Sequence, residues 1–306
     1  MHSSKSADSA MERNGFRCGA VAIVGRPNVG KSTLLNALVG ERVSITSDKP
    51  QTTRHRIRGI LTTQRAQFVF VDTPGYQTRH RSALNRYMSR GVRQAVGDAD
   101  CVMLVVEAGR FLPEDRRLAH LIGSAVPVVL AVNKIDRDQA PERLLPFLET
   151  VSREREFDDI VPVSARRGKG LKELLRVLQR HLPEREAQFA EDDFTDRSGR
   201  FLAAEAVREK LFRRLGDEIP YGACVTIDKF EESPRLRRIF ASIVVEKQSH
   251  KAIVIGAGGE KLKRVASDAR RDLERLFGGK VYLEVWVKVR GGWTDDEAAL
   301  KRLGYE

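Results

Sequence analysis

The amino-acid sequence predicts an α/β protein in which a doubly wound, mostly parallel sheet is followed by a smaller α+β unit. Three observations lead to this prediction. The chain has 306 residues, whereas single hydrophobic cores rarely grow beyond about 250 to 300 residues. In the first half of the chain, short apolar runs alternate with helix-like segments, as in sheets covered by helices on both faces. After Pro183 the composition becomes acidic and loop-like, which predicts a linker between two units.

These observations divide the chain into five segments. We expect a disordered tail over 1–16, a first unit over 17–185, a linker over 186–199, a second unit over 200–292 and a C-terminal tail over 293–306. Within the first unit we expect strands over 20–24, 67–71, 127–132 and 159–163, and helices near 31–39, 83–97, 141–156 and 171–181.

Composition indicates a cytosolic protein with a polyanionic partner. No apolar run approaches the roughly 18 residues of a membrane span, and the polar start lacks the apolar stretch of a signal peptide. The net charge is +12. Basic residues outnumber acidic ones by 29 to 18 over 17–185 and by 20 to 13 over 199–292, so charge alone does not choose a binding unit, and a solvated basic surface remains an alternative. Cys18, Cys101 and Cys224 are too scattered for a disulfide framework or a zinc site.

The first strand leads into a G-x-x-x-x-G-K-S loop, which is typical of phosphate-binding loops. Its glycines let backbone N–H groups and a helix N-terminus approach a phosphate closely. The lysine would reach the β- and γ-phosphates, and the serine hydroxyl would ligate Mg²⁺. The alternative is an ordinary glycine-rich turn. The predicted phosphate-binding residues are Gly25, Arg26, Pro27, Asn28, Val29, Gly30, Lys31, Ser32 and Thr33.

Three further loops follow later strands and meet the same sheet edge, because parallel strands share their carboxyl ends. The first carries Asp72, which can hold a magnesium-bound water. The second carries Asp136, whose carboxylate can accept two hydrogen bonds from guanine but none in that arrangement from adenine. We expect Asn133 to join the phosphate and base loops, Lys134 to cover the purine and the last loop to meet the guanine carbonyl. The predicted residues are Asp72, Thr73, Pro74, Gly75, Tyr76, Asn133, Lys134, Ile135, Asp136, Ser164 and Ala165.

This ordered set of motifs resembles the translation-factor-like P-loop GTPases, and G-R-P-N-V-G-K-S-T-L-L-N narrows the resemblance to their Era-like branch. The resemblance implies that residues 45–56 form the first switch segment. It makes Thr53 a magnesium ligand beside Ser32, with loop capping as the alternative, and it assigns a K⁺-binding role to Asn28. It implies GTP and GDP as ligands, with catalytic positions at Lys31, Thr53, Asp72 and Gly75.

Hydrolysis is predicted to be slow. Tyr76 occupies the position at which Ras-like enzymes carry a water-orienting glutamine, and Gln77 is one residue out of register. No arginine finger in cis is evident. We therefore predict a GTP-operated conformational switch with a turnover on the order of 10⁻⁴ to 10⁻² s⁻¹.

The second unit shows the element order of a type II KH domain. We expect an amphipathic helix over 200–215, strands over 223–230, 236–246 and 281–289, and a G-x-x-G loop between two helices. Such a loop lets a single-stranded nucleic-acid backbone lie against it, although a plain helix-linking turn is the alternative. The predicted RNA-binding residues are Lys251, Ile255, Gly256, Ala257, Gly258, Gly259, Lys261, Lys263 and Arg264.

The resemblance covers nearly all of residues 17–306. It implies a monomeric protein that binds the 3′ end of 16S ribosomal RNA and acts in assembly of the small (30S) ribosomal subunit. It also implies peripheral association with the inner membrane. The alternative from another class is an RNA-binding scaffold in which the nucleotide is only structural. A GTPase of RNA modification or membrane transport is a further alternative, but no catalytic cysteine motif or spanning segment supports it.

Overall fold

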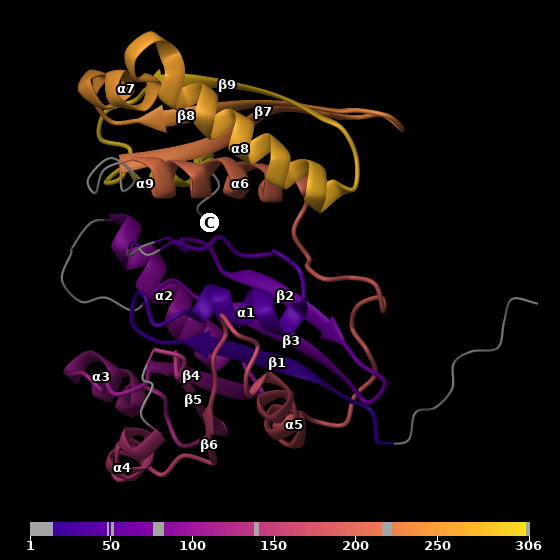
Figure 1. The fold of residues 1–306 in the computed structure, drawn as a ribbon, viewed down its shortest axis with the longest axis vertical. Coiled ribbons are helices and arrows are strands. Elements are labelled where there is room, and N and C mark those ends of the chain that lie inside the picture. Colours follow the sequence, from indigo (N-terminus) through magenta and orange to yellow (C-terminus); the bar gives the residue numbers. More distant parts are fainter. Residues whose placement is uncertain are drawn as a thin grey trace, which may run out of the picture.

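The computed structural model describes residues 15–47, 49, 52–75, 83–137, 141–215 and 222–303. The predicted N-terminal tail up to residue 14 therefore lies outside the described residues, as do Tyr76, Gln77 and the last three residues. Figure 1 shows two units stacked along the long axis, with the second unit above the first.

The first unit is a six-stranded sheet in the order β2-β3-β1-β4-β5-β6. All of its pairings are parallel except that of β2 with β3, at the edge. This arrangement confirms the predicted fold class. The strands are β1 (Arg17–Val24), β2 (Ile57–Thr62), β3 (Ala66–Asp72), β4 (Cys101–Glu107), β5 (Val128–Asn133) and β6 (Asp159–Pro162).

Helices cover both faces of this sheet, as its strand sequences require. Successive residues of a strand point to opposite faces, and β4 and β5 are buried along their whole length. One face packs against α1 (Lys31–Val39) and α5 (Leu171–His181). The other packs against α2 (Ala83–Gly97), α3 (Pro113–Leu121) and α4 (Pro141–Ser152).

Several details differ from the sequence prediction. Strands β2 and β4 are additional to the four strands that were expected, and two helices also differ. The helix expected over 141–156 ends at Ser152, because Arg155 leaves the helix and donates hydrogen bonds to the carbonyls of Ala119, Ile122 and Gly123 at the end of α3. Helix α3 itself was not predicted, although Pro113 at its first position and two acidic residues in its first turn are helix-start signals.

The second unit is a three-stranded sheet, β7 (Ala223–Glu232), β8 (Arg237–Val245) and β9 (Val281–Val289), with β7 antiparallel and β9 parallel to β8. One face packs against α6 (Gly199–Arg214), α7 (Gln248–Ile255) and α8 (Glu260–Phe277). A short 3₁₀ turn, η2 (Ala257–Gly259), joins the last two helices. Val281 and Val287 of β9 are buried, whereas Val289, its last residue, is 41% exposed.

Helix α6 corrects the prediction of a simple amphipathic helix. Glu205, Arg208, Glu209 and Lys210 are all buried, as are the apolar residues on its sheet side. Figure 1 shows the reason: α6 lies on the side of the second unit that faces the first. The helix is therefore covered on two sides, and its charged residues pair within the interface.

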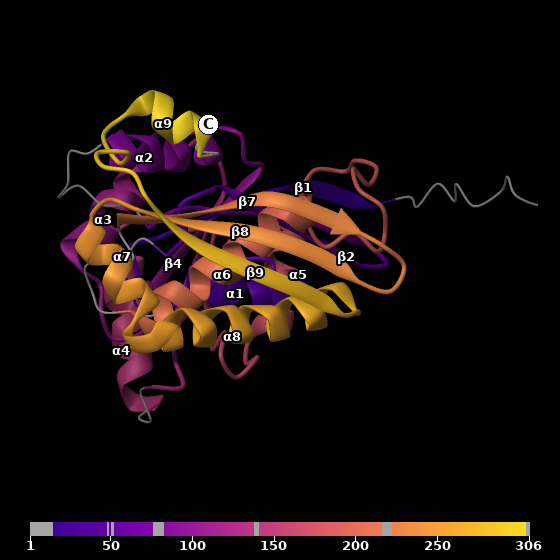
Figure 2. The same cartoon turned by 90° about the horizontal axis from the view of Figure 1, so that it is seen from above.

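The last segment also joins the two units. Trp293 is completely buried, and α9 (Glu297–Arg302) packs with it against Ala83, Leu84 and Met88 of α2. Seen from above in Figure 2, α9 lies directly beside α2. The region predicted as a tail thus makes an apolar contact between the units.

Candidate nucleotide-binding site

The phosphate loop has backbone conformations that favour glycine. Gly30 has φ 101° and caps α1, and Asn28 has φ 65°. A Cβ on Gly30 would lie 2.4 Å from Nδ2 of Asn133, so any side chain there would displace the Asn133 amide from its hydrogen bond to the Val29 carbonyl. The N-terminal N–H groups of α1 remain available to a ligand because they have no partners within the helix. The loop therefore forms a cradle of backbone donors suited to a phosphate.

Lys31 lies inside this loop. Its ammonium donates hydrogen bonds to the carbonyls of Gly25 and Arg26 at 3.0 and 3.1 Å. Burial lowers its pKa to about 8, against the opposing effect of the nearby Asp72 carboxylate. A phosphate would favour the charged form of the lysine, so the ammonium is placed to pair with an anion in the loop.

Two predicted magnesium ligands and Asp72 converge beneath the loop. The Ser32 hydroxyl lies 2.8 Å from the Thr53 hydroxyl and donates to Oδ2 of Asp72 at 2.7 Å. Ser44 donates to the same oxygen at 2.8 Å. The other carboxylate oxygen, Oδ1, is buried without a hydrogen-bond partner among the described residues. Two hydroxyls beside a carboxylate with an unused oxygen form a hard oxygen donor set that fits Mg²⁺ and its bound waters.

Asn133 connects the phosphate and base loops, as its position predicts. Its amide nitrogen donates to the carbonyl of Val29 at 2.9 Å, and its oxygen accepts from the N–H of Ala165 at 3.0 Å. The Ile135 N–H donates to the Val163 carbonyl, which anchors the base loop just beyond β6. These hydrogen bonds hold three loops in fixed positions relative to one another around the base-binding position.

Asp136 is held in place by Ser164, whose hydroxyl donates to Oδ1. This hydrogen bond lowers the pKa of Asp136, assisted by Arg167 and Arg166. The carboxylate is therefore ionised at neutral pH and offers acceptors only, which matches the two adjacent donors of guanine.

A cluster around Glu107 escaped the sequence analysis. Its carboxylate lies 3.0 Å from Lys134, 3.2 Å from Arg137 and 3.8 Å from Arg26. Burial raises its pKa, but these cations outweigh burial and leave it lowered. Lys134 also donates to the Asn28 carbonyl at 2.6 Å. Glu107 follows the predicted edge rule, since it ends β4 at the carboxyl end of the sheet.

The remaining predicted residues lie along the same edge. Thr73 donates to the carbonyl of Ile23 at 2.7 Å, and a Cβ on Gly75 would lie 2.8 Å from Pro27. Arg26 also pairs with the buried Asp115 at 2.9 Å, a partner that the sequence did not suggest. A groove beside the loop is lined by Pro27, Asn28, Gly30, Lys31, Ser32, Thr33, Ile45, Thr46, Ser47, Lys49, Thr52, Thr53 and Gly75. Pro74 lines a separate pocket on the α2 side.

The G-x-x-G loop is a tight connection between α7 and α8. Gly256, Gly258 and Gly259 have φ values of 71°, 56° and 79°, which favour glycine. Ala257 and Gly258 are exposed and Ile255 is half-buried in the core of the second unit. The basic side chains around the loop lie at its surface: Lys251, Lys261, Lys263 and Arg264.

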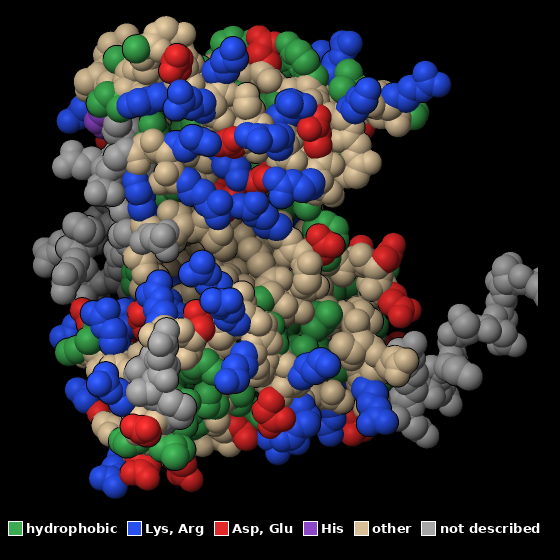
Figure 3. Space-filling view, in the orientation of Figure 1, with side chains coloured by type: hydrophobic (Ala, Val, Ile, Leu, Met, Phe, Trp, Pro, Cys, Tyr) green, Lys and Arg blue, Asp and Glu red, His purple; other side chains and the backbone are tan. Residues whose placement is uncertain are grey.

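Basic side chains extend well beyond this loop. Figure 3 shows Lys and Arg gathered over α6 and α8 and along the hollow between the two units. Several are paired, such as Arg271 and Arg214 with Asp268. The described surface of the second unit therefore presents a basic face next to the glycine loop, as a polyanion-binding surface would.

Fold and site together define a P-loop GTPase joined to a KH domain. Residues 20–134 match the family described as 50S ribosome-binding GTPase, and residues 218–294 match the KH domain family. Two solved structures span the whole architecture at 37% identity, each covering 95% of this chain and 99% of the other. They are an Aquifex aeolicus Era variant bound to GDP and AlF₄⁻, with TM-score 0.92, and Era with MgGDPNP and nucleotides 1506–1542 of 16S ribosomal RNA, with TM-score 0.91.

Relatives in sequence lead to the same family. GTPase Era of Nitrosomonas eutropha is 53% identical over 296 residues, which cover 97% of this chain and 100% of the relative. GTPase Era of Bordetella avium is 52% identical with the same coverage. GTPase Era of Chromobacterium violaceum is 52% identical over 95% of this chain and 98% of the relative. The chain belongs to the Era family of GTPases, and its reaction is the hydrolysis of GTP.

Proposed function

We propose that the protein is a slow GTP-operated switch that binds the 3′ region of 16S ribosomal RNA and acts in assembly of the small (30S) ribosomal subunit. One observation supports the proposal that the protein is a switch. Arg54, next to the magnesium-ligand candidate Thr53, is completely buried and donates to the carbonyl of Ala223 in the KH domain at 2.9 Å. The segment that would respond to the γ-phosphate is therefore in direct contact with the proposed RNA-binding domain.

The RNA part of the proposal rests on the glycine loop and on one relative. The loop joins two helices and consists mostly of glycine, so it has few side-chain atoms. Basic residues surround it. The solved Era complex with nucleotides 1506–1542 of 16S ribosomal RNA covers 95% of this chain. A KH loop of this kind holds about four nucleotides of single-stranded backbone, so unpaired RNA is the ligand to test first.

Magnesium and a monovalent cation belong to the same proposal. Ser32 and Thr53 would ligate Mg²⁺, with Asp72 holding one of its waters. Mg²⁺ supplies charge neutralisation between the β- and γ-phosphates. For Asn28 we propose K⁺ binding at the mouth of the phosphate loop. Asn28 is exposed in the phosphate loop, with φ 65°, which supports this proposal.

Single-turnover hydrolysis tests the slow rate and the cation. We expect a rate constant of about 10⁻⁴ to 10⁻² s⁻¹ for the isolated protein, because no water-orienting glutamine follows Gly75. Parallel assays in KCl and NaCl at equal ionic strength test Asn28, and faster hydrolysis in KCl is expected. A rate above about 10 s⁻¹, at the level of ordinary metabolic enzymes, would contradict a timer. Equal rates in the two salts would contradict the K⁺ assignment.

Nucleotide-dependent RNA binding tests the function itself. We expect the affinity for a single-stranded oligonucleotide with the 16S 3′-end sequence to differ about tenfold between the GDP and GTP-analogue states, a typical coupling between two sites. A salt series from about 50 to 200 mM separates phosphate contacts from base contacts. Equal affinity with GDP, with the analogue and without nucleotide would favour the scaffold alternative, in which the nucleotide is structural.

Location and oligomeric state stay predictions. We propose a monomer in the cytoplasm, with peripheral association at the inner face of the membrane, on the resemblance alone. Among the residues that the structure describes, no helix combines the length and apolar character needed to cross a bilayer.

A further inference from the structure

The first switch segment is held by the KH domain as well as by the GTPase domain. The two residues just before it are fixed to α1, where the Asn36 side chain accepts from the N–H groups of Val43 and Ser44 and donates to the Ser44 carbonyl. Two residues further on, the contacts pass to α6 of the KH domain. The switch segment therefore begins next to Ser44, which donates to the magnesium-site carboxylate of Asp72, and then contacts a helix of the other domain.

Thr46 is the point of attachment on α6. Oε1 of Glu209 accepts from the Thr46 backbone N–H at 3.0 Å and lies 3.2 Å from its hydroxyl. Arg213, one turn further along α6, donates to the Thr46 carbonyl at 3.1 Å and to the hydroxyl at 2.9 Å. Two adjacent side chains of one helix thus engage every polar group of a single switch residue.

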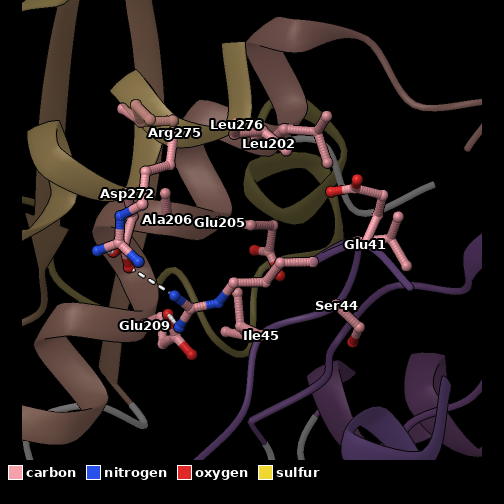
Figure 4. A pocket seen from close by; sticks show the side chains of 13 residues that line it. Glu41, Ser44, Ile45, Leu202, Glu205, Ala206, Glu209, Asp272, Arg275 and Leu276 are labelled. Carbon is pink, nitrogen blue, oxygen red and sulfur yellow. Dashed lines mark hydrogen bonds and ion pairs between the residues drawn. The ribbon is translucent and has the colours of Figure 1, made fainter. Parts of the chain in front are cut away.

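Glu209 is buried at its contact with Thr46. It is 1% exposed, and its carboxylate also pairs with Arg42, Lys210 and Arg213. Figure 4 shows Glu209 and Asp272 among the side chains that line a pocket between the two domains. Asp272 pairs with Arg42 as well, but no contact joins it to Thr46 among the described residues.

The far end of the segment is anchored independently. The Arg54 guanidinium lies 5.7 Å from the Phe212 ring and 6.0 Å from the Trp293 ring, in addition to its bond with the Ala223 carbonyl. Thr53 is therefore placed against Ser32 by attachments on both sides, at Thr46 and at Arg54. Both attachments belong to the KH domain.

We propose that Glu209 is a positioning residue for the GTP state: by holding Thr46 it keeps the first switch segment in the conformation in which Thr53 reaches the magnesium site. The inference deepens the proposed switch and rests on it. A loop that ligates Mg²⁺ only in the triphosphate state loses GTP affinity when its closed form becomes less populated, whereas GDP affinity is unaffected. Glu209 therefore biases the protein toward GTP from outside the GTPase domain.

The test is nucleotide binding by a Glu209→Ala variant of the full chain, with Mg²⁺ present. We expect affinity for a non-hydrolysable GTP analogue to fall about tenfold and affinity for GDP to change less than about twofold. Glu209→Gln keeps an oxygen acceptor for Thr46 and is expected to recover most of the lost affinity. Asp272→Asn is the matched control, because it removes another partner of Arg42 but no bond to Thr46; its analogue affinity should stay within about twofold of wild type.

Trp293 provides a readout other than affinity. The chain has two tryptophans, and in a Trp286→Phe background Trp293 alone reports on its neighbour Arg54. We expect its emission to differ between the GDP and analogue states, and Glu209→Ala to abolish most of that difference. If Glu209→Ala does not fold, the test uses Arg213→Ala, which removes the more exposed of the two side chains that contact Thr46. We expect this variant to lose about threefold in affinity for the analogue.

The outcomes separate the two proposals. If the wild type shows the same Trp293 emission and RNA affinity in both nucleotide states, the proposed switch fails. If the wild type switches but Glu209→Ala binds the analogue as tightly as wild type, the positioning role fails alone. Equal losses of GDP and analogue affinity, or equal effects of Glu209→Ala and Asp272→Asn, would assign Glu209 to domain docking and would also overturn the inference.

Discussion

Replacing Asp136 with asparagine is expected to change the preferred base of the nucleotide from guanine to xanthine. The carboxylate of Asp136 offers two acceptors to the N1–H and the exocyclic amine of guanine. An amide offers one acceptor and one donor, so the guanine amine would face an N–H group. A buried polar site rejects the wrong partner by roughly 10⁴-fold. We expect GTP affinity to fall about 10³- to 10⁴-fold, or about 4 to 5.5 kcal/mol.

Xanthine has a carbonyl where guanine has its amine, so it can accept a hydrogen bond from the side-chain amide of the Asp136→Asn variant. Competition of GDP and XDP against a fluorescent nucleotide measures the change directly. Ser164→Ala is the matched control: it removes the hydrogen bond that holds Asp136 but leaves the recognition chemistry unchanged. We expect that control to weaken GDP about tenfold at most, as for one hydrogen bond to a charged group, without favouring xanthine. An Asp136→Asn variant that still prefers guanine would contradict the base assignment.

Aspartates in the G-x-x-G loop are expected to abolish RNA binding and to leave GTP hydrolysis unchanged. In the double variant Gly256→Asp and Gly259→Asp, two negative charges would face the phosphates of the bound strand. We expect RNA affinity to fall at least about 100-fold, or roughly 2.7 kcal/mol. Both positions have positive φ. The substitution at Gly259, in the left-handed region, also costs roughly 1 to 2 kcal/mol of stability, and at Gly256 a Cβ would lie 2.8 Å from the Lys261 side chain.

A control at the other end of the same helix separates repulsion from strain. Gly278 ends α8 with φ 63° and has no atom within 4 Å of a Cβ position. Gly278→Asp therefore adds the same residue in the left-handed region that Gly259 also occupies, away from the loop. Gly256 lies in a different region, with ψ 174°, so the control is matched to Gly259. We expect this control to keep its RNA affinity within about twofold, since it touches no phosphate. Fluorescence anisotropy with a labelled oligonucleotide, beside a thermal melt of each variant, measures both effects. RNA binding retained by the double variant would contradict the KH loop assignment.

The sequence determined the nucleotide site because each part of that site is local. Every motif follows its own strand, and parallel strands bring their carboxyl ends to one edge whatever the loops contain. The parallel pairings of β1 with β3, of β4 with β1 and β5, and of β5 with β6 bring Asp72, Asn133 and Ser164 to that edge, although β4 itself was not among the predicted strands. The glycine loop of the KH domain was predictable for a similar reason, since the turn between α7 and α8 is built from adjacent residues.

Only the tertiary structure decided how the two domains meet. Glu209 lies 163 residues from Thr46 in the sequence, and Trp293, near the end of the chain, packs on α2 in the first domain. No periodicity or motif in the sequence predicts such pairs. A charged residue on a helix is expected to face solvent, and only the structure shows that another domain covers it. The sequence by itself therefore determined what the protein binds, a guanine nucleotide. The packing of α6 decided that the KH domain also holds the switch segment of that site, since only burial between the domains turns the Glu209 carboxylate into a fixed acceptor for Thr46.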